Sequence, residues 1–147
     1  MSLFSNFRRR TNGLEVFTSR LDSTIQLASV YRQTNLLGRN DVTGANRILQ
    51  VSVLSLKKNH LVPAHTHNPI PRETIGTSEC WVVVKGQVTF DLFDTDDVLI
   101  HTVKLKKHNI VVFYAGGHSL RVLTKMAQIY ELKNGPYEGV LIDKRQI

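Results

Sequence analysis

Two histidines separated by one residue are the clearest candidates for chemistry in this chain. His65 and His67 form an H-x-H pair in a segment that the sequence predicts to be extended. Side chains at positions i and i+2 of a strand share one face, so both imidazoles can point into one cavity. Neutral imidazole nitrogens are common ligands of divalent metal ions. The pair alone is a weak signal, because H-x-H also arises by chance as two exposed histidines in a loop.

Two residues further along the chain could complete a metal site. Glu79 begins a long apolar segment, where a carboxylate must be paired, exposed or bound to a metal. His118 follows Ala115-Gly116-Gly117, and these small residues allow the backbone to approach a site closely. Six residues lie between Glu79 and Gly86. A glycine inside such a strand-rich stretch indicates a bend or bulge at Gly86.

This pattern resembles the cupin superfamily. The first motif of that family joins an H-x-H pair to a downstream Glu and then, after six residues, to a Gly; the second motif supplies a third His. Asn59 stands where the family has a Gly before the first His, and Asn is the non-Gly residue best suited to a left-handed turn. The resemblance implies an all-β fold, a cupin-type jelly-roll barrel with an N-terminal arm. It also implies one divalent metal ion held by His65, His67, Glu79 and His118.

The spacing departs from the family pattern in two places. Eleven residues separate His67 from Glu79, where the usual motif has three or four. Glu73 is nearer to the usual spacing and competes as the carboxylate ligand, whereas only Glu79 keeps the spacing to Gly86 and begins a strand. In the second motif the expected Gly, Pro and Gly are replaced by Lys107, Phe113 and Ala115.

A narrower resemblance covers most of the chain. Several segments are similar to a group of small cupins linked to surface-polysaccharide and sugar biosynthesis, namely H-x-H-N, T-S-E-C-W-V-V-V-K-G-Q-V, G-G-H-S and K-N-G-P-Y-E-G-V-L-I-D-K. That group has a long loop between the H-x-H pair and the Glu. The resemblance implies that the chain binds or acts on a small polar molecule, such as a sugar or nucleotide sugar.

Three His and one carboxylate leave one or two coordination positions open, and such a set suits Fe, Mn, Ni, Co or Zn. The ion could polarise a carbonyl or hydroxyl in an isomerase- or epimerase-like reaction. Two alternatives stay open: a non-catalytic small-molecule binding module with a structural metal, and an Fe-dependent dioxygenase. The residues do not decide whether the chain is an enzyme.

Two residues near the expected site could contact a substrate. Arg72 lies in the loop between His67 and Glu79 and could hold a carboxylate or phosphate, or else pair with Glu73. Trp81 shares strand parity with Glu79 and could line the cavity or pack in the core.

The elements expected to carry these residues are mostly strands. Residues 1–46 are expected to form an N-terminal arm and loop that crosses to a partner subunit, and residues 47–147 the barrel domain. The stretch 21–32 fits a helix or a strand, and 34–46 reads as a loop. Strands are expected in the last hundred residues at 48–56, 79–93, 98–105, 110–114, 118–124, 126–132 and 139–142.

Composition limits the remaining possibilities. The chain has 147 residues, 41% of them hydrophobic and 21% charged, as expected for one soluble globular domain. Its longest apolar run is too short to cross a membrane, and no apolar run follows the basic N-terminal stretch, so we expect no secretory signal. The single cysteine, Cys80, is compatible with the cytoplasm.

A net charge of +7 fits attraction for phosphorylated small molecules, but no motif indicates nucleic-acid binding. A homodimer is expected.

Overall fold

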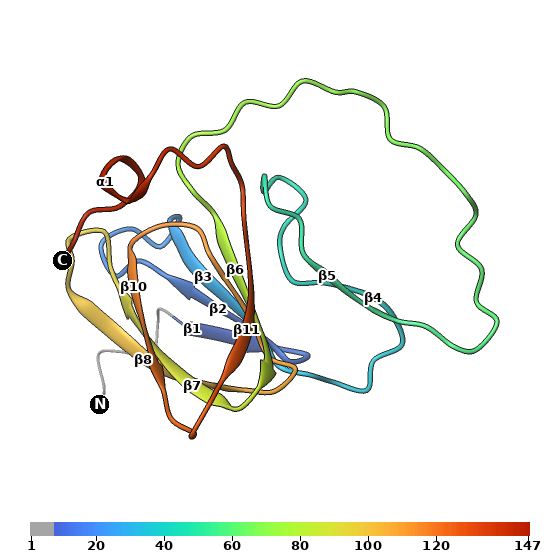
Figure 1. Ribbon diagram of the computed structural model, residues 1–147, viewed down its shortest axis with the longest axis horizontal. Coiled ribbons are helices and arrows are strands. Elements are labelled where there is room, and N and C mark those ends of the chain that lie inside the picture. Colours follow the sequence, from blue (N-terminus) through green and yellow to red (C-terminus); the bar gives the residue numbers. More distant parts are fainter. Residues whose placement is uncertain (1–7) are drawn as a thin grey trace.

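The computed structural model describes residues 8–147, and antiparallel sheets dominate it (Figure 1). Short runs of β-branched and aromatic residues, separated by Gly, Asn and Asp, favour strands over helices throughout. The strands are β1 (Arg8–Thr11), β2 (Leu14–Thr18), β3 (Gln26–Tyr31), β4 (Gly38–Asp41), β5 (Ser52–Ser55), β6 (Glu79–Lys85), β7 (Gln87–Phe93), β8 (Leu99–Lys106), β9 (Ile110–Phe113), β10 (Gly117–Val122) and β11 (Gln128–Lys133). One short helix, α1 (Val140–Asp143), lies near the C-terminus.

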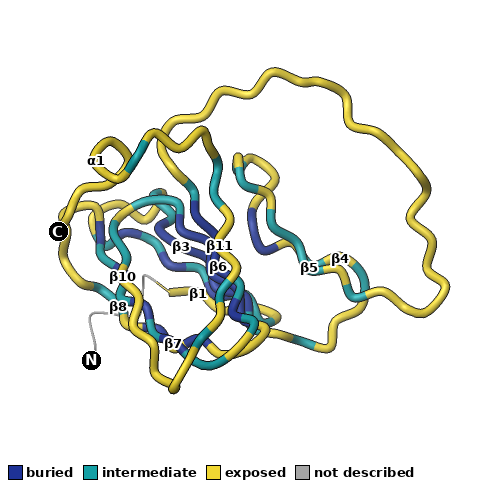
Figure 2. Tube along the Cα trace, viewed as in Figure 1, coloured by how far each residue is buried: buried dark blue, intermediate teal, exposed yellow. Residues whose placement is uncertain are grey.

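Two sheets face each other across the core. Six strands form one sheet in the order β1-β2-β3-β9-β6-β11, and three form the other in the order β10-β7-β8. Alternation along β7 buries Val88, Phe90 and Leu92 against residues of β6 and β9, because alternate side chains of a strand share a face. Figure 2 shows these buried segments at the centre of the molecule. Within residues 8–147 the two sheets do not join into a closed barrel.

Two glycines allow the chain to turn between sheets. Gly86 has a φ of +78° between β6 and β7, and a Cβ there would collide with the Met126 carbonyl oxygen. Gly116 has a φ of +71° just before β10, and its Cβ would meet the carbonyl oxygen of Phe93. Glycine adopts such backbone without strain, so Gly86 allows the crossing from β6 to β7 and Gly116 the start of β10.

A second, smaller hydrophobic cluster covers the outer face of the large sheet. Cys80 and Val112 alternate with core residues of β6 and β9 and therefore point away from the small sheet. The segment of β4 and β5 packs against them through Val42 and, less completely buried, Val51 and Val53. Burial raises the pKa of the Cys80 thiol to about 12, so this cysteine stays protonated and unreactive.

A long loop follows this hairpin. Residues 56–78 contain no helix or strand and swing away from the sheets before returning to β6 (Figure 1). Such a long segment without secondary structure is uncommon in a compact domain and often serves a function. We call residues 56–78 the histidine loop, because His65 and His67 lie in it.

Most of the predicted strands are confirmed. The stretch 79–93 forms β6 and β7 with the expected bend at Gly86, and β8 to β11 lie where strands were predicted. The stretch 21–32 contains a strand, β3, and not a helix. Asn59 has the expected left-handed backbone, with a φ of 66°.

Three predictions about secondary structure need correction. Residues 34–46 were expected to be loop, but they contain β4, which pairs with β5. Only four residues of the stretch 48–56 form a strand. Residues 139–142 were expected to form a strand, but Gly139 has a φ of 107° and the residues after it make the exposed turn of α1.

The domain boundary predicted after residue 46 stays a prediction. In this chain the residues before it contribute β1, β2 and β3 to the same sheet as β6, β9 and β11. The predicted exchange of this arm with a partner falls partly on residues 1–7, which lie outside the described residues. Among the described residues, no helix is both long enough and apolar enough to cross a membrane.

Candidate functional site

Glu79 and His118 face each other from the two sheets. Glu79 opens β6, where it lies opposite Phe113 of β9, and His118 is the second residue of β10. The Nε2 atom of His118 lies 3.7 Å from Oε1 of Glu79. The Glu79 side chain is 8% exposed and that of His118 is 26% exposed, so the pair lies at the edge of the core with one side open to solvent.

Aromatic side chains fix both residues. The Trp81 indole Nε1 donates a hydrogen bond of 2.6 Å to Oε1 of Glu79. The Phe113 ring stacks on the His118 imidazole with centroids 4.0 Å apart, and the Trp81 ring meets the same imidazole edge-on at 5.1 Å. These contacts hold a carboxylate oxygen and an imidazole nitrogen in fixed positions, which is how proteins prepare a binding site. We call Glu79, Trp81, Phe113 and His118 the Glu79 site.

The carboxyl group of Glu79 is ionised across the ordinary pH range. Burial opposes its ionisation, but the hydrogen-bonding and charge interactions with His118, the Trp81 donor and the positive charge of Lys144 outweigh that effect. Together they lower its pKa to about 2. Within the described residues both Trp81 and His118 approach Oε1, so Oε2 remains for a further ligand.

A cavity of about 780 Å³ opens beside this pair, within the usual size range of small-molecule sites. Glu79, Phe113 and His118 form part of its wall, and the C-terminal segment forms another part. Lys133 and Lys144 add positive charge to the wall. Asp94, Asp97 and Asp143 line it too, so the wall carries charges of both signs and suits a polar molecule.

Asn134 ties the end of the histidine loop to this cavity. Its Oδ1 accepts a hydrogen bond of 2.7 Å from the backbone N–H of Ser78, and its Nδ2 donates one of 3.1 Å to the Gly76 carbonyl oxygen. The last residues of the loop are therefore fixed beside Glu79, while the rest of the loop extends away.

The other two predicted ligands lie apart from the cavity. His65 and His67 are both exposed on the histidine loop, with ring centroids 5.2 Å apart. Nδ1 of His65 lies 2.9 Å from the Pro63 carbonyl oxygen, and a proton on Nδ1 leaves Nε2 as the ligating atom. In the described part of the chain, no three His, Cys, Asp or Glu side chains are grouped as metal ligands. Thus two pairs of candidate ligands are formed, but they do not meet.

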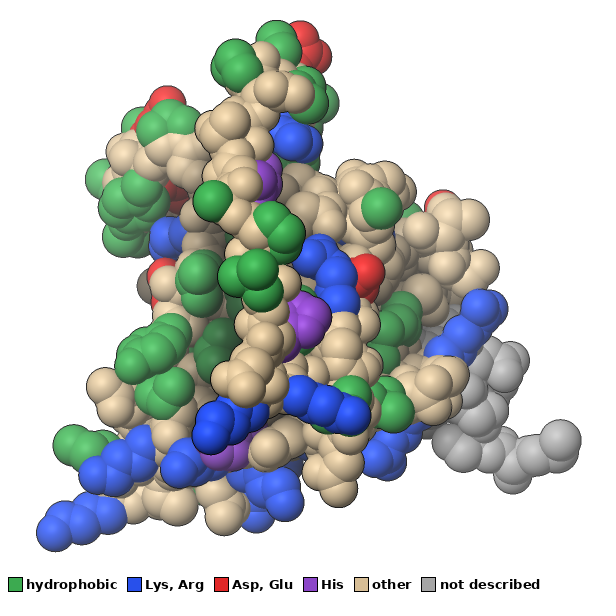
Figure 3. Space-filling view, turned by 90° about the vertical axis from the view of Figure 1, so that its right-hand side faces the viewer, with side chains coloured by type: hydrophobic (Ala, Val, Ile, Leu, Met, Phe, Trp, Pro, Cys, Tyr) green, Lys and Arg blue, Asp and Glu red, His purple; other side chains and the backbone are tan. Residues whose placement is uncertain are grey.

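The loop places its apolar residues in solvent as well. Leu61, Val62, Ile70 and Ile75 are all more than half exposed. Figure 3 views the molecule from the side on which the loop lies, with apolar and histidine side chains on the surface and basic side chains gathered toward the lower edge. An exposed apolar segment of this kind is typical of a surface that contacts another part of the same chain or another molecule.

The remaining predicted site residues are placed as follows. Glu73 and Arg72 are both exposed on the loop, and no ion pair joins them in the described structure. Of the two competing carboxylates, only Glu79 lies next to His118. Trp81 is 7% exposed and belongs to the core cluster, so it supports Glu79 and is not part of the cavity wall.

Three residues of the site were not found from the sequence. Phe113 was noted only as a departure from the second cupin motif, although its parity on β9 places it opposite Glu79. Asn134 precedes Gly135-Pro136, a pair typical of turns, and nothing in its surroundings indicates a contact with the loop. Lys144 comes from the C-terminal segment, and no local pattern indicates that it approaches Glu79.

Comparison with protein-family models, with curated proteins and with solved structures gave no match to this chain. The function is therefore argued from the geometry of the site.

Proposed function

We propose that this chain is a metal-binding protein of the cupin type that binds or converts a small polar molecule, such as a sugar or nucleotide sugar. The observation that carries the proposal is the Glu79–His118 pair, held from two facing sheets at the wall of a 780 Å³ cavity. The chain crosses from one sheet to the other between β6 and β7 and again between β9 and β10, which supports a jelly-roll arrangement.

The residues present fit a metal ion in part. An ionised carboxylate and an imidazole nitrogen 3.7 Å apart are close to the spacing of two ligands on one ion, since each ligand lies about 2.0–2.2 Å from the metal. His65 and His67 supply two more nitrogens of the right kind. The proposal requires the histidine loop to move so that these imidazoles reach Glu79 and His118.

The chain's own residues suggest how a ligand would be held. Glu79 and His118 would meet its polar centre, and Lys144 would attract an anionic substituent such as a phosphate. Arg72 would add a further cation when the loop lies over the cavity. A bound divalent ion would polarise a carbonyl or hydroxyl of the ligand. The loop would exclude water from the closed site.

We further propose that the protein is a cytoplasmic homodimer. In the described chain β10 and β11 end their sheets, and their residues Leu120, Val122 and Tyr130 are exposed. Open strand edges with apolar side chains favour pairing with a second copy. In such a dimer the histidine loop of one copy could serve either its own cavity or that of its partner. Sedimentation equilibrium tests the dimer directly.

The metal content of the purified protein tests the site. After growth with added Fe, Mn, Ni, Co and Zn, elemental analysis should find about one divalent ion per wild-type chain. A His65→Ala, His118→Ala double variant should lose it. Glu79→Ala should lose the ion while Glu73→Ala keeps it, with circular dichroism confirming that each variant is folded.

Each other outcome has a definite meaning. A wild-type chain free of metal under these conditions refutes the proposal. Loss of metal from Glu73→Ala with retention in Glu79→Ala refutes the assignment of the carboxylate. A Zn-loaded protein that binds a sugar nucleotide without converting it supports a binding module, and an Fe-loaded protein that consumes oxygen supports a dioxygenase.

A further inference from the structure

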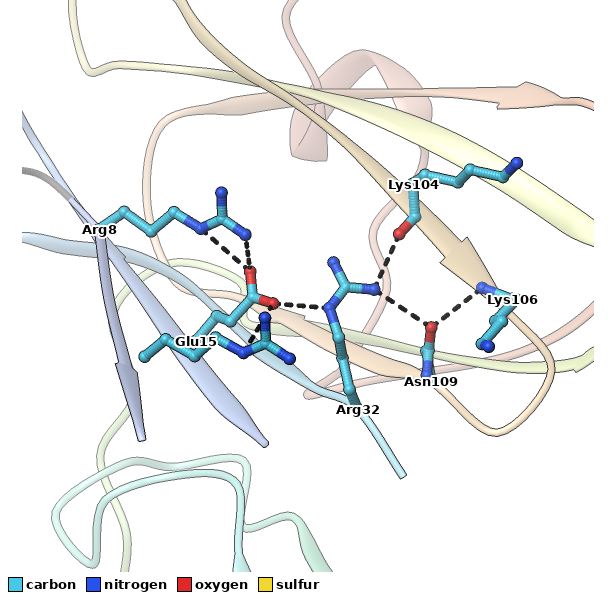
Figure 4. A network of polar contacts seen from close by, with 7 residues as sticks. Arg8, Glu15, Arg32, Lys104, Lys106 and Asn109 are labelled. Carbon is cyan, nitrogen blue, oxygen red and sulfur yellow. Dashed lines mark hydrogen bonds and ion pairs between the residues drawn. The ribbon is translucent and has the colours of Figure 1, made fainter. Parts of the chain in front are cut away.

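A second buried carboxylate lies at the opposite edge of the sandwich. Glu15 of β2 has a side chain that is 0% exposed, and arginines from three neighbouring positions surround it (Figure 4). The β1–β2 register pairs Arg10 with Glu15, and alternation places Arg8 on the same face of β1 as Arg10. Arg32, at the end of β3, approaches from the other side. This cluster is unrelated to the Glu79 site.

Arg8 and Arg32 already use both oxygens of Glu15. Arg8 donates to Oε2 from Nε at 3.1 Å and from a terminal nitrogen at 2.6 Å. Arg32 donates to Oε1 from Nε at 2.6 Å, and its Nη1 donates to the Lys104 carbonyl oxygen at 3.0 Å. Figure 4 shows that the remaining terminal nitrogen of each guanidinium points away from Glu15, toward the same side.

Arg8 and Arg32 line a groove of about 300 Å³. Its walls are Arg8, Arg32 and residues 102–106 of β8, which include Lys104 and Lys106. We call it the arginine groove. Within residues 8–147, neither lysine forms an ion pair with a carboxylate. Three arginines thus share a single carboxylate, and the two lysines of the wall add further positive charge to the groove.

Arg8 and Arg32 are held in place before any ligand arrives. Arg8 lies 5.6 Å over the ring of Phe17 and is bound twice to Glu15. Arg32 is fixed by Glu15, by the Lys104 carbonyl and, at 3.4 Å, by Oδ1 of Asn109. Ordered guanidinium groups lose little conformational entropy on binding an anion.

We propose that the arginine groove binds the phosphate group of a small phosphorylated molecule. Guanidinium groups match the geometry of phosphate oxygens, and a dianion balances the excess charge better than a single carboxylate does. The volume suits a phosphate with a small substituent. The site lies apart from the cavity at Glu79, and it goes beyond the function proposed above.

Calorimetric titration with inorganic phosphate in a low-salt chloride buffer tests the proposal. The wild-type protein should bind one phosphate per chain with a Kd of about 1 mM or tighter. Arg8→Ala should weaken the affinity about tenfold, the loss expected for one charge-assisted partner. Lys106→Ala should weaken it by a smaller factor. Methyl phosphate should bind as well as phosphate if the natural ligand is an ester, and less well if it is the free ion.

A matched control variant locates the binding. Arg9→Ala removes the same charge from the opposite face of β1 and should leave the affinity unchanged. Equal affinities of Arg8→Ala and Arg9→Ala would overturn the proposal. A single-stranded oligonucleotide that binds through Arg8 more tightly than phosphate, with a steep salt dependence, would also overturn it.

Discussion

Two buried glutamates occupy opposite edges of this sandwich, and their partners differ in kind. Glu15 is bound by arginines, which carry permanent charge and occupy both of its oxygens. Glu79 is held by the neutral indole of Trp81 and by His118, whose charge depends on protonation. In both cases the pKa of the carboxyl group is lowered, because these interactions outweigh the effect of burial.

The difference separates a structural carboxylate from one that is available for binding. The negative charge of Glu15 is fully compensated by arginines. The hydrogen-bond donors of Arg8 and Arg32 that Glu15 does not use remain for a ligand in the arginine groove. The carboxyl group of Glu79 is ionised and faces a cavity. Within the described chain Trp81 and His118 both approach its Oε1 atom, so Oε2 is left for a ligand. A carboxylate held like Glu79, by an indole and an imidazole, can give up one of these interactions when a ligand binds.

The largest effect is expected from Glu15→Gln. The substitution removes the only carboxylate that compensates Arg8, Arg10 and Arg32 in the described structure, and the arginines then repel one another. Because these arginines are partly exposed, we expect a loss near the lower end for broken buried pairs, about 3 kcal/mol in the free energy of unfolding. Urea denaturation at pH 7 measures it, and a loss below about 1 kcal/mol would contradict the account. The same variant, if folded, should bind phosphate more tightly.

A somewhat smaller effect concerns acid stability. Glu79 has a folded-state pKa of about 2 against an ordinary value of 4.5, so its ionisation stabilises the fold above about pH 4.5. This contribution is lost as the pH falls from about 4.5 toward 2. It amounts to at most about 3 kcal/mol by the linkage relation. Urea denaturation of wild type and Glu79→Gln, both with a chelator, should show a difference in stability at pH 6 that shrinks toward pH 2. A difference that does not vary with pH would count against the lowered pKa.

The smallest effect is expected from Trp81→Phe. Phenylalanine keeps most of the aromatic packing but removes the indole donor to Glu79. The free energy of unfolding should fall by about 1–2 kcal/mol, and the pKa of Glu79 should rise toward its ordinary value. Carboxyl-resolved NMR titration measures that pKa. Phe90→Leu, which alters the same core without touching Glu79, is the matched control and should leave the pKa unchanged.

The sequence predicted much of the β-structure because the signals were local. Alternation, together with Gly86, placed β6 and β7, and the parity of Glu79 and Trp81 put them on one face. The left-handed turn at Asn59 was expected from the resemblance, because Asn59 stands where the cupin motif has a Gly and Asn tolerates that backbone. The H-x-H pair and His118 were identified as candidates by type and spacing, and the structure brings His118 to Glu79.

What the sequence did not predict depends on distant contacts. The Glu15 cluster requires the register of β1 on β2 and the approach of Arg32 from β3, which no local pattern specifies. Residues 140–142 include the β-branched Val140 and Ile142, which favour a strand, but they do not pair with another strand and form most of α1. The position of the histidine loop could not be predicted either, because few of its residues pack against the sheets.

Metal affinity compared between the two glutamate variants tests the central claim most directly. Isothermal titration of metal-free wild type, Glu79→Gln and Glu15→Gln with a divalent ion, each confirmed as folded by circular dichroism, gives the three dissociation constants. We expect wild type and Glu15→Gln to bind one ion per chain with similar affinity and Glu79→Gln to bind at least about 100-fold more weakly. Equal affinities of wild type and Glu79→Gln, or no binding by the wild type, would contradict the account.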